Sequence, residues 1–175
     1  MKTVFCALLL TFCVPAPAKE PHLAKVDDQV YRGRQPKKED FPELAKRGIH
    51  TILDLRGGPI HGPHERRIVE AAGMKYITIR LSGLFPPKQR QIEKILGVLD
   101  DPANAPVFIH CRRGDDRVGM VIACYRMQHD HWTNAQAMAE AEQNHISPLE
   151  VLMRRYIRRF DASKLQIQPA PAAGQ

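Results

Sequence analysis

Cysteine is scarce in this sequence, and internal repeats are absent. The chain has four cysteines, and no two of them have the close spacing typical of zinc-binding pairs, which argues against a structural zinc site. No segment recurs at a fixed period, which excludes a solenoid or another repeat architecture. We therefore expect a fold that is held by a hydrophobic core and needs neither a metal nor a cofactor.

The length and charge of the chain limit its class. Its 175 residues suit one compact domain, and hydrophobic residues make up 43% of them, enough for a core. Lysine and arginine outnumber aspartate and glutamate by 26 to 19, which gives a formal charge of +7. A basic surface favours anionic partners such as phosphorylated molecules, nucleic acid or anionic membranes. Charge alone does not choose among these.

The first 18 residues have the pattern of an export signal. Lys2 provides a positive start, and the apolar run 4–14 is too short to span a bilayer. Ala16-Pro17-Ala18 matches a cleavage site that would make Lys19 the first residue of the mature chain. We therefore expect an exported protein that is periplasmic or secreted, and an uncleaved N-terminal anchor is the alternative.

Cleavage would leave Cys111 and Cys124. An exported protein meets oxidising conditions, in which two cysteines can form a disulfide. Cys124 lies on the apolar face of an expected helix, however, and would behave as a small core residue. We expect no structural disulfide between them, and a regulatory one stays open.

Strand and helix patterns alternate along the chain. The expected strands cover residues 29–32, 49–55, 74–81 and 106–110. The expected helices cover residues 37–47, 64–72, 88–99 and 118–127, and two more begin after Thr133 and at Pro148. The alternation predicts an α/β fold, a three-layer sandwich with a central, largely parallel sheet flanked by helices. The apolar run Val107-Phe108-Ile109 predicts a central strand that is buried on both faces.

The segment from His110 to Gly119 joins this central strand to a helix. Backbone N–H groups converge where a strand ends and a helix begins, and the helix N-terminus adds free donors and a positive dipole end, so such a loop binds anions. Gly114 allows a backbone conformation that other residues avoid, and Gly119 lets the helix pack closely. Arg117 can contact two phosphate oxygens. In this positive field Cys111 is expected to be a thiolate that attacks phosphorus.

This pattern resembles the signature of the protein tyrosine and dual-specificity phosphatase superfamily, in which five residues separate the cysteine from the arginine. The resemblance implies that Cys111 is the nucleophile and Arg117 the phosphate clamp. It also implies that His110 supports the thiolate and the loop geometry.

Two further segments resemble one branch of that superfamily, the atypical dual-specificity phosphatases of plants, fungi and bacteria. They are Val30–Pro36, which contains Tyr-Arg-Gly-Arg-Gln-Pro, and Asp54-Leu55-Arg56. The likeness runs over residues 31–160. We expect a phosphatase domain over residues 19–164, followed by a disordered tail at 165–175 that is rich in proline, alanine and glutamine.

The sequence departs from the family at two positions. The family usually has serine or threonine after the arginine, where its hydroxyl helps the sulfur leave, but this chain has Val118. Many relatives carry an aspartic general acid on an upstream loop, and the matching loop 82–87 has no carboxylate. Myotubularin and Sac phosphatases place an aspartate directly before the arginine, so we predict Asp116 as the acid, with Asp115 second. The alternative is a carboxylate that orders the loop by pairing with an arginine.

Arg112 and Arg113 add positive charge beside the phosphate site and resemble the basic loops of phosphatases for highly anionic substrates. Arg56 follows a strand at the carboxyl edge of the sheet and is placed to face the pocket. The alternative for all three is a solvated surface position. The residues expected to contact substrate are Arg56, Arg112, Arg113, Gly114, Asp115, Val118 and Gly119.

The sequence thus predicts a phosphomonoester hydrolase that acts through a phosphocysteine on phosphorylated proteins, phosphoinositides or soluble inositol phosphates. Val118 and the loop 82–87 leave a second hypothesis open, a phosphate-binding module with little turnover. A sulfurtransferase of the rhodanese type also uses a loop cysteine, but the spacing of Cys111 and Arg117 suits phosphatases better. We expect a monomer that does not bind nucleic acid, and contact with a membrane surface stays open.

Overall fold

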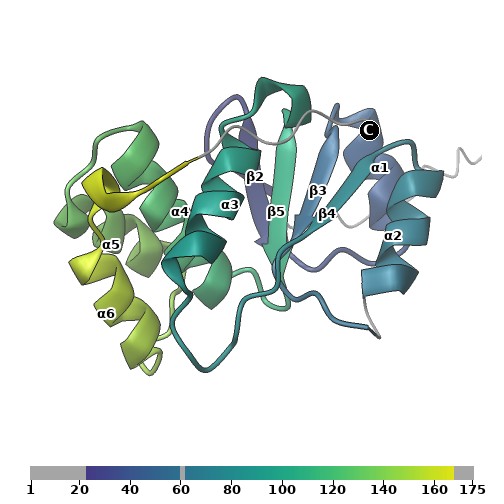
Figure 1. Ribbon diagram of the computed structural model, residues 1–175. Coiled ribbons are helices and arrows are strands. Elements are labelled where there is room, and N and C mark those ends of the chain that lie inside the picture. The colour runs from purple at the N-terminus through teal and green to yellow at the C-terminus, as the bar shows by residue number, and fades with distance from the viewer. Residues whose placement is uncertain (1–22, 60–61, 168–175) are drawn as a thin grey trace, which may run out of the picture.

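The computed structural model describes residues 23–59 and 62–167, which form a five-stranded sheet with six α-helices around it (Figure 1). The expected export signal at residues 1–18 lies outside the described residues. The strands are β1 (Leu23–Lys25), β2 (Val30–Arg34), β3 (Thr51–Asp54), β4 (Lys75–Thr78) and β5 (Val107–Cys111). None of the described helices is both long and apolar enough to cross a membrane.

The sheet has the order β1-β2-β5-β3-β4, and β5 lies at its centre. β2 and β3 both pair parallel with β5, and β4 pairs parallel with β3, whereas β1 is antiparallel to β2. All five residues of β5 are buried. The predicted central strand and the largely parallel sheet are therefore confirmed. The register sets Arg34 of β2 opposite Cys111, and Asp54 of β3 opposite His110.

Helices cover both faces of the sheet and complete three layers (Figure 1). The helices are α1 (Asp40–Lys46), α2 (Gly62–Ala71), α3 (Gln89–Leu99), α4 (Asp116–His129), α5 (Asn134–Gln143) and α6 (Val151–Arg159). Two short 3₁₀ helices, η1 (Pro102–Asn104) and η2 (Ala162–Lys164), complete the described elements. α1 and α2 lie on one face, and α3 to α6 lie on the other. The predicted three-layer α/β sandwich is confirmed.

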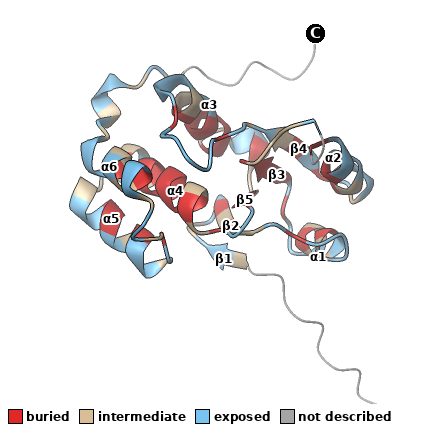
Figure 2. Ribbon diagram, turned by 90° about the horizontal axis from the view of Figure 1, so that it is seen from below, coloured by how far each residue is buried: buried red, intermediate tan, exposed pale blue. Residues whose placement is uncertain are grey.

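Strand alternation divides the core in two, because successive side chains point to opposite faces of a sheet. Ile52 and Phe108 pack on the side of α1 and α2, whereas Leu53 and Ile109 pack on the side of α3 and α4. α4 is buried along most of its length (Figure 2), since it lies against the sheet and against α3, α5 and α6. The helix that follows the cysteine loop is thus held by packing on several sides.

The structure corrects the expected start of the last helix. Ser147 to Glu150 forms a turn in which the Ser147 hydroxyl accepts a hydrogen bond from Leu149 N, and α6 begins only at Val151. Pro148 therefore lies in the turn and not at the first helical position. The expected N-cap Thr133 does begin α5, in a reciprocal pair of hydrogen bonds with Gln136.

Two segments at the ends of the described chain were not anticipated. β1 was missed because an edge strand of three residues has too short a pattern to detect. The expected tail begins at residue 165, but Leu165 and Ile167 pack against the core and Gln166 N donates to Glu93 at 2.9 Å. Residues 168–175 lie outside the described residues.

Candidate active site

Cys111 is the last residue of β5, and the loop 112–115 leads from it into α4. The residue is buried, with 2% of its surface exposed, and its Sγ accepts a hydrogen bond from Gly114 N at 3.3 Å. Sγ is therefore placed among the N–H groups at the start of a helix, where negative charge is favoured. A cavity of about 540 Å³ opens over Cys111, and it is lined by Gly83, Arg112, Arg113, Asp116, Arg117, Glu150 and Met153.

β2 fixes the shape of this loop through Gly114. That residue has a φ of +92°, and a Cβ added to it would lie 2.6 Å from Gly33 C and 2.7 Å from Arg34 N. The buried Arg32 also donates from Nη2 to the Gly114 carbonyl at 3.1 Å. The Tyr-Arg-Gly-Arg segment that the sequence singled out therefore supports the cysteine loop from the neighbouring strand.

Asp116, the predicted general acid, is buried and makes two hydrogen bonds. Its Oδ2 accepts from Arg113 Nη2, and its Oδ1 accepts from Ser147 N at 2.9 Å. The Asp116 bond is also the main cause that raises the pKa of Arg113. Each oxygen of the carboxylate therefore already has one partner within the protein. The side chain ties the start of α4 to the turn before α6, as the loop-ordering alternative expects, and the acid role of Asp116 stays a prediction.

The other predicted carboxylate, Asp115, lies 3.8 Å from Arg113 Nε and is about one third exposed. It does not line the cavity over Cys111. Glu150 does line that cavity, and among the described residues its carboxylate has no hydrogen-bond partner. Sequence reasoning missed Glu150, because it lies far along the chain from the cysteine and only the turn before α6 brings it near.

Arg56 lies beside the site, but its guanidinium is already paired. Nε lies 2.9 Å from Asp54 Oδ1, and Nη2 lies 3.0 Å from Asp54 Oδ2 and also contacts Glu65 Oε2. Only 9% of the Arg56 side chain is exposed. The structure therefore gives Arg56 an ion-pairing role between two buried carboxylates, and its contact with substrate stays a prediction.

His110 is fully buried beneath the loop and borders this ion-paired group. Its Nδ1 lies 3.4 Å from the Cys111 carbonyl oxygen, and its ring stacks on Phe108 with centroids 5.9 Å apart. Nε2 lies 2.8 Å from Glu65 Oε1, although neither atom has a hydrogen bond of good geometry to a described residue. The side chain thus bridges the cysteine strand to α2.

Burial alone would raise the pKa of Asp54, but the hydrogen bond from Arg56 and the charge of His110 lower it overall. Tyr76 also donates its hydroxyl to Asp54 Oδ2 at 2.9 Å, and burial with the nearby Asp54 charge raises the Tyr76 pKa. Atoms of Asp54, Glu65 and His110 lie within 4.8 Å of one another and are of types that ligate metals. Because Arg56 already bonds both carboxylates, these residues fit an ion-pair network better than a metal site.

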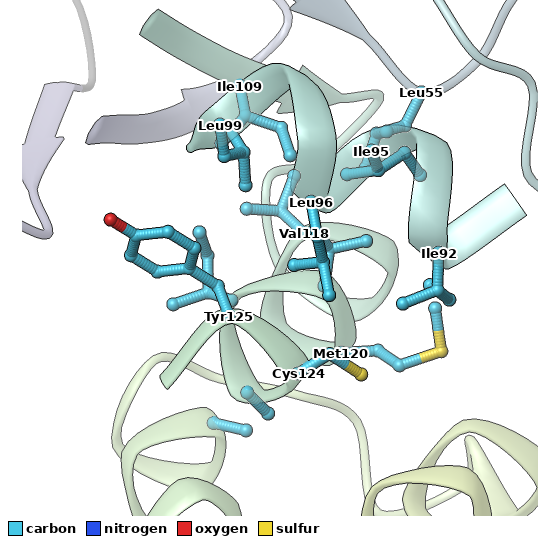
Figure 3. Close-up of a cluster of buried hydrophobic side chains, with 14 of the residues drawn as sticks. Leu55, Ile92, Ile95, Leu96, Leu99, Ile109, Val118, Met120, Cys124 and Tyr125 are labelled. Atoms are coloured by element: carbon cyan, nitrogen blue, oxygen red, sulfur yellow. The ribbon is translucent and has the colours of Figure 1, made fainter. Parts of the chain in front are cut away.

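Of the other residues predicted to act on the substrate, some line the cavity over Cys111 and some lie in the hydrophobic core. Arg112, Arg113 and Arg117 line the cavity over Cys111. Val118 and Gly119 are buried in α4, and Figure 3 shows Val118 beside Leu96 in the apolar cluster between α3 and α4. The loop 82–87 contributes Gly83 to the cavity. Its Leu84 and Phe85 are 76% and 67% exposed.

The described cysteines are both free. Cys124 is fully buried in α4, where burial raises its pKa strongly, and Figure 3 shows it on the helix beside Met120. It therefore behaves as the small core residue that the sequence predicted. Cys111 is left as the thiol of the loop between β5 and α4.

Comparison with known proteins agrees with this geometry. The family model described as "DSP-PTPase phosphatase fused to NAD+ Kinase" matches residues 16–157. The chain is 28% identical over 153 residues to inositol diphosphatase DSP1 of Oryza sativa, with 85% of this chain and 68% of that protein covered. It is 26% identical over 151 residues to inositol diphosphatase SIW14 of Saccharomyces cerevisiae, with 83% and 53% covered.

Solved structures show the same fold. The catalytic core of the yeast inositol pyrophosphate phosphatase SIW14 has a TM-score of 0.73 at 24% identity, with 83% of this chain and 89% of that chain covered. TpbA of Pseudomonas aeruginosa has a TM-score of 0.69 at 18% identity, with 82% and 87% covered. Because the family model spans most of the chain and includes the whole cysteine loop, the protein belongs to the DSP-PTPase phosphatase family and is a cysteine-dependent phosphatase.

Proposed function

We propose that the protein hydrolyses the diphosphate group of an inositol diphosphate, by transfer of the outer phosphoryl group to Cys111. The observation that carries this proposal is the loop 82–87, which has no carboxylate, whereas the resemblance to dual-specificity phosphatases implies an aspartic general acid on this loop in many members. A phosphate that leaves from a diphosphate is a far weaker base than the alkoxide that leaves from a phosphomonoester, so it has less need of a proton in the transition state. The names of the relatives DSP1 and SIW14 support the same substrate class.

In the first step the Cys111 thiolate attacks the outer phosphorus. The bond from phosphorus to the bridging oxygen breaks, and its electron pair leaves with the inositol phosphate. The N–H groups of the loop, Gly114 among them, and the Arg117 guanidinium stabilise the charge on the transferred oxygens. Gly114 N already donates to Sγ at 3.3 Å, so one N–H donor of the loop faces the attacking sulfur.

In the second step water attacks the phosphocysteine, the sulfur leaves as a thiolate, and a base takes the proton of the water. Glu150 is the best candidate for that base, because it lines the cavity over Cys111 and its carboxylate has no hydrogen-bond partner among the described residues. Asp116 is less suited, since both of its oxygens accept hydrogen bonds within the protein. General base catalysis of this kind contributes about 10²- to 10⁴-fold in rate.

Steady-state kinetics on three substrates test the proposal. An inositol diphosphate, the inositol monophosphate ester of the same ring and a phosphotyrosine peptide are compared, with Cys111→Ser as the inactive control. The expected result is the highest kcat/KM for the diphosphate. A higher kcat/KM for either monoester would overturn the diphosphate assignment while leaving the phosphatase chemistry intact.

Rapid kinetics separate the roles of the two carboxylates. In Glu150→Gln the first turnover should stay fast and the phosphocysteine should accumulate, because only the second step needs the base. Asp116→Asn should lower the stability of the protein and the rates of both steps, since it loosens the loop. If Asp116→Asn instead slows the hydrolysis of substrates with poor leaving groups more than that of substrates with good ones, Asp116 is the general acid and does more than order the loop.

We also propose export, on the pattern of residues 1–18. N-terminal sequencing of protein recovered from the periplasm or the medium should then begin at Lys19. Recovery in the cytoplasm of a chain that still begins at Met1 would contradict it.

A further inference from the structure

A second cavity, of about 590 Å³, adjoins the cavity over Cys111 and shares Arg112 and Arg117 with it. Its volume falls in the range of about 300–1,000 Å³ that is usual for small-molecule sites. The rest of its described lining consists of Gln35, Arg56, Gly57, Gly58, Pro59 and Arg80. Arg80 follows β4 by two residues and was not singled out from the sequence.

The charge of this cavity is not compensated. Four of the eight described lining residues are arginines, and none is a carboxylate. The charge of Arg56 is neutralised by its buried partners, and Arg117 is assigned to the transferred phosphoryl group. Arg80 and Arg112 are therefore the two arginines of this cavity that can bind a further anion. Both are exposed, and among the described residues neither guanidinium has an ion pair or a hydrogen bond. Two such cations at the wall of a cavity create a positive potential that attracts an anionic group.

The backbone holds Arg80 firmly at this position. Ile79 N donates to the Asp54 carbonyl at 3.1 Å, Leu81 N donates to the Leu55 carbonyl at 2.9 Å, and Gln91 Nε2 donates to the Arg80 carbonyl at 2.7 Å. Gly57 packs so closely that a Cβ on it would lie 2.8 Å from the Arg80 Cβ. The base of the Arg80 side chain is therefore fixed against the turn that lines the cavity.

We propose that this cavity is a subsite for a second phosphate group of the substrate, bound by Arg80 and Arg112, while the transferred phosphoryl group lies over Cys111. The proposal deepens the proposed function, because it requires a substrate that carries several phosphates on one small molecule. A substrate with a single phosphate makes no use of the subsite. Arg80 is thus a specificity residue with no part in bond breaking.

Competitive inhibition tests the subsite without assuming the substrate. Hydrolysis of p-nitrophenyl phosphate, which carries one phosphate, is inhibited with inositol hexakisphosphate or with inorganic phosphate. In Arg80→Gln the inhibition constant of inositol hexakisphosphate should rise about tenfold or more, the range for a lost charge-assisted hydrogen bond. The inhibition constant of inorganic phosphate and the kcat/KM for p-nitrophenyl phosphate should stay within about twofold, since neither ligand reaches Arg80.

Arg90→Gln is the matched control, because Arg90 is an exposed arginine of α3 that lines neither cavity. It should change none of these constants, and Arg80→Lys should restore part of the affinity for inositol hexakisphosphate. If Arg80→Gln weakens the binding of both inhibitors equally, Arg80 acts on the catalytic loop. If it weakens the binding of neither inhibitor, the cavity is not a subsite. If the diphosphate preference fails but the inhibition result holds, only the proposed function is wrong.

Discussion

Gly114 in the cysteine loop and Gly119 in the first turns of α4 should respond in opposite ways to the same substitution. In Gly114→Ala the new Cβ meets Gly33 C at 2.6 Å, Arg34 N at 2.7 Å and Gly33 O at 2.8 Å, and φ is +92°. The left-handed conformation costs about 1–2 kcal/mol with a side chain. The overlap is with backbone, which cannot rotate away, and forced shifts of this kind cost about 1–3 kcal/mol. We therefore expect a loss of about 2–5 kcal/mol in the free energy of unfolding.

Gly119→Ala provides the matched comparison. At that position the nearest atom to a new Cβ is Ile146 Cβ at 3.7 Å, an ordinary contact, and the residue lies inside α4. Alanine in a helix interior is more stable than glycine by about 1 kcal/mol, so this variant should be neutral or slightly more stable.

Urea unfolding followed by circular dichroism measures both stabilities, and hydrolysis of p-nitrophenyl phosphate measures kcat/KM. Gly114→Ala should lose about 100-fold in kcat/KM, because relief of the overlap with β2 displaces the N–H donors around Cys111 by about 1 Å. Gly119→Ala should keep its activity. A Gly114→Ala variant as stable and as active as the parent chain would refute the clash with β2, and so would equal losses of stability and activity in both variants.

Four further predictions concern the site and the residues that support it. Cys111→Ser should abolish turnover and Cys124→Ser should not. Of the two described cysteines, iodoacetamide should modify only Cys111, as read by mass spectrometry, because burial raises the Cys124 pKa. Arg56→Met should lose about 3–5 kcal/mol in urea unfolding, since it leaves buried carboxylates without their cation. Because the pKa of Asp54 is lowered overall, its contribution to stability is full above about pH 4, the unfolded value, and is lost as the pH falls further. Val118→Thr should cost about 1–3 kcal/mol for its buried hydroxyl, and should speed decay of the phosphocysteine in single-turnover assays if the missing hydroxyl limits that step.

Three of these predictions have a clear contradicting outcome. Turnover by Cys111→Ser would exclude the thiolate mechanism. Unchanged stability of Arg56→Met at pH 7 would show that the ion pairs with Asp54 and Glu65 contribute nothing. Unchanged decay of the phosphocysteine in Val118→Thr would remove the valine as the cause of a slow second step.

Much of the fold could be predicted because its signals are local. The apolar run of β5 and the glycine and arginine of the loop each lie within a few residues of Cys111, so the strand, the loop and the helix can be recognised together. The start of α6 was predicted wrongly for a tertiary reason. Asp116 accepts a hydrogen bond from Ser147 N across the fold, and this helps to hold Ser147 to Glu150 as a turn. No local pattern records that bond.

The function, like the fold, could be predicted from the sequence only in part. The family match bears out a phosphatase, whereas the matches give no support to the rhodanese alternative or to a module without turnover. The roles of individual site residues stay predictions. From the sequence Arg56 was expected to face the substrate, and in the structure it lines the cavity next to the one over Cys111. The sequence did not indicate that Arg56 also pairs with Glu65, which lies on α2 and comes near only in the folded chain.

By itself, the sequence determined the α/β class, the cysteine loop and its chemistry, because the spacing of Cys111, Gly114 and Arg117 defines one turn of backbone around an anion. Only the tertiary structure decided which of the many charges are free to act. Asp116 and Arg56 are buried or nearly so and are paired within the protein, whereas among the described residues Glu150, Arg80 and Arg112 line the cavities with no side-chain ion pair or hydrogen bond. The physical reason is that a charge acts on a ligand only if no nearer partner neutralises it, and the distance to that partner is a property of the fold.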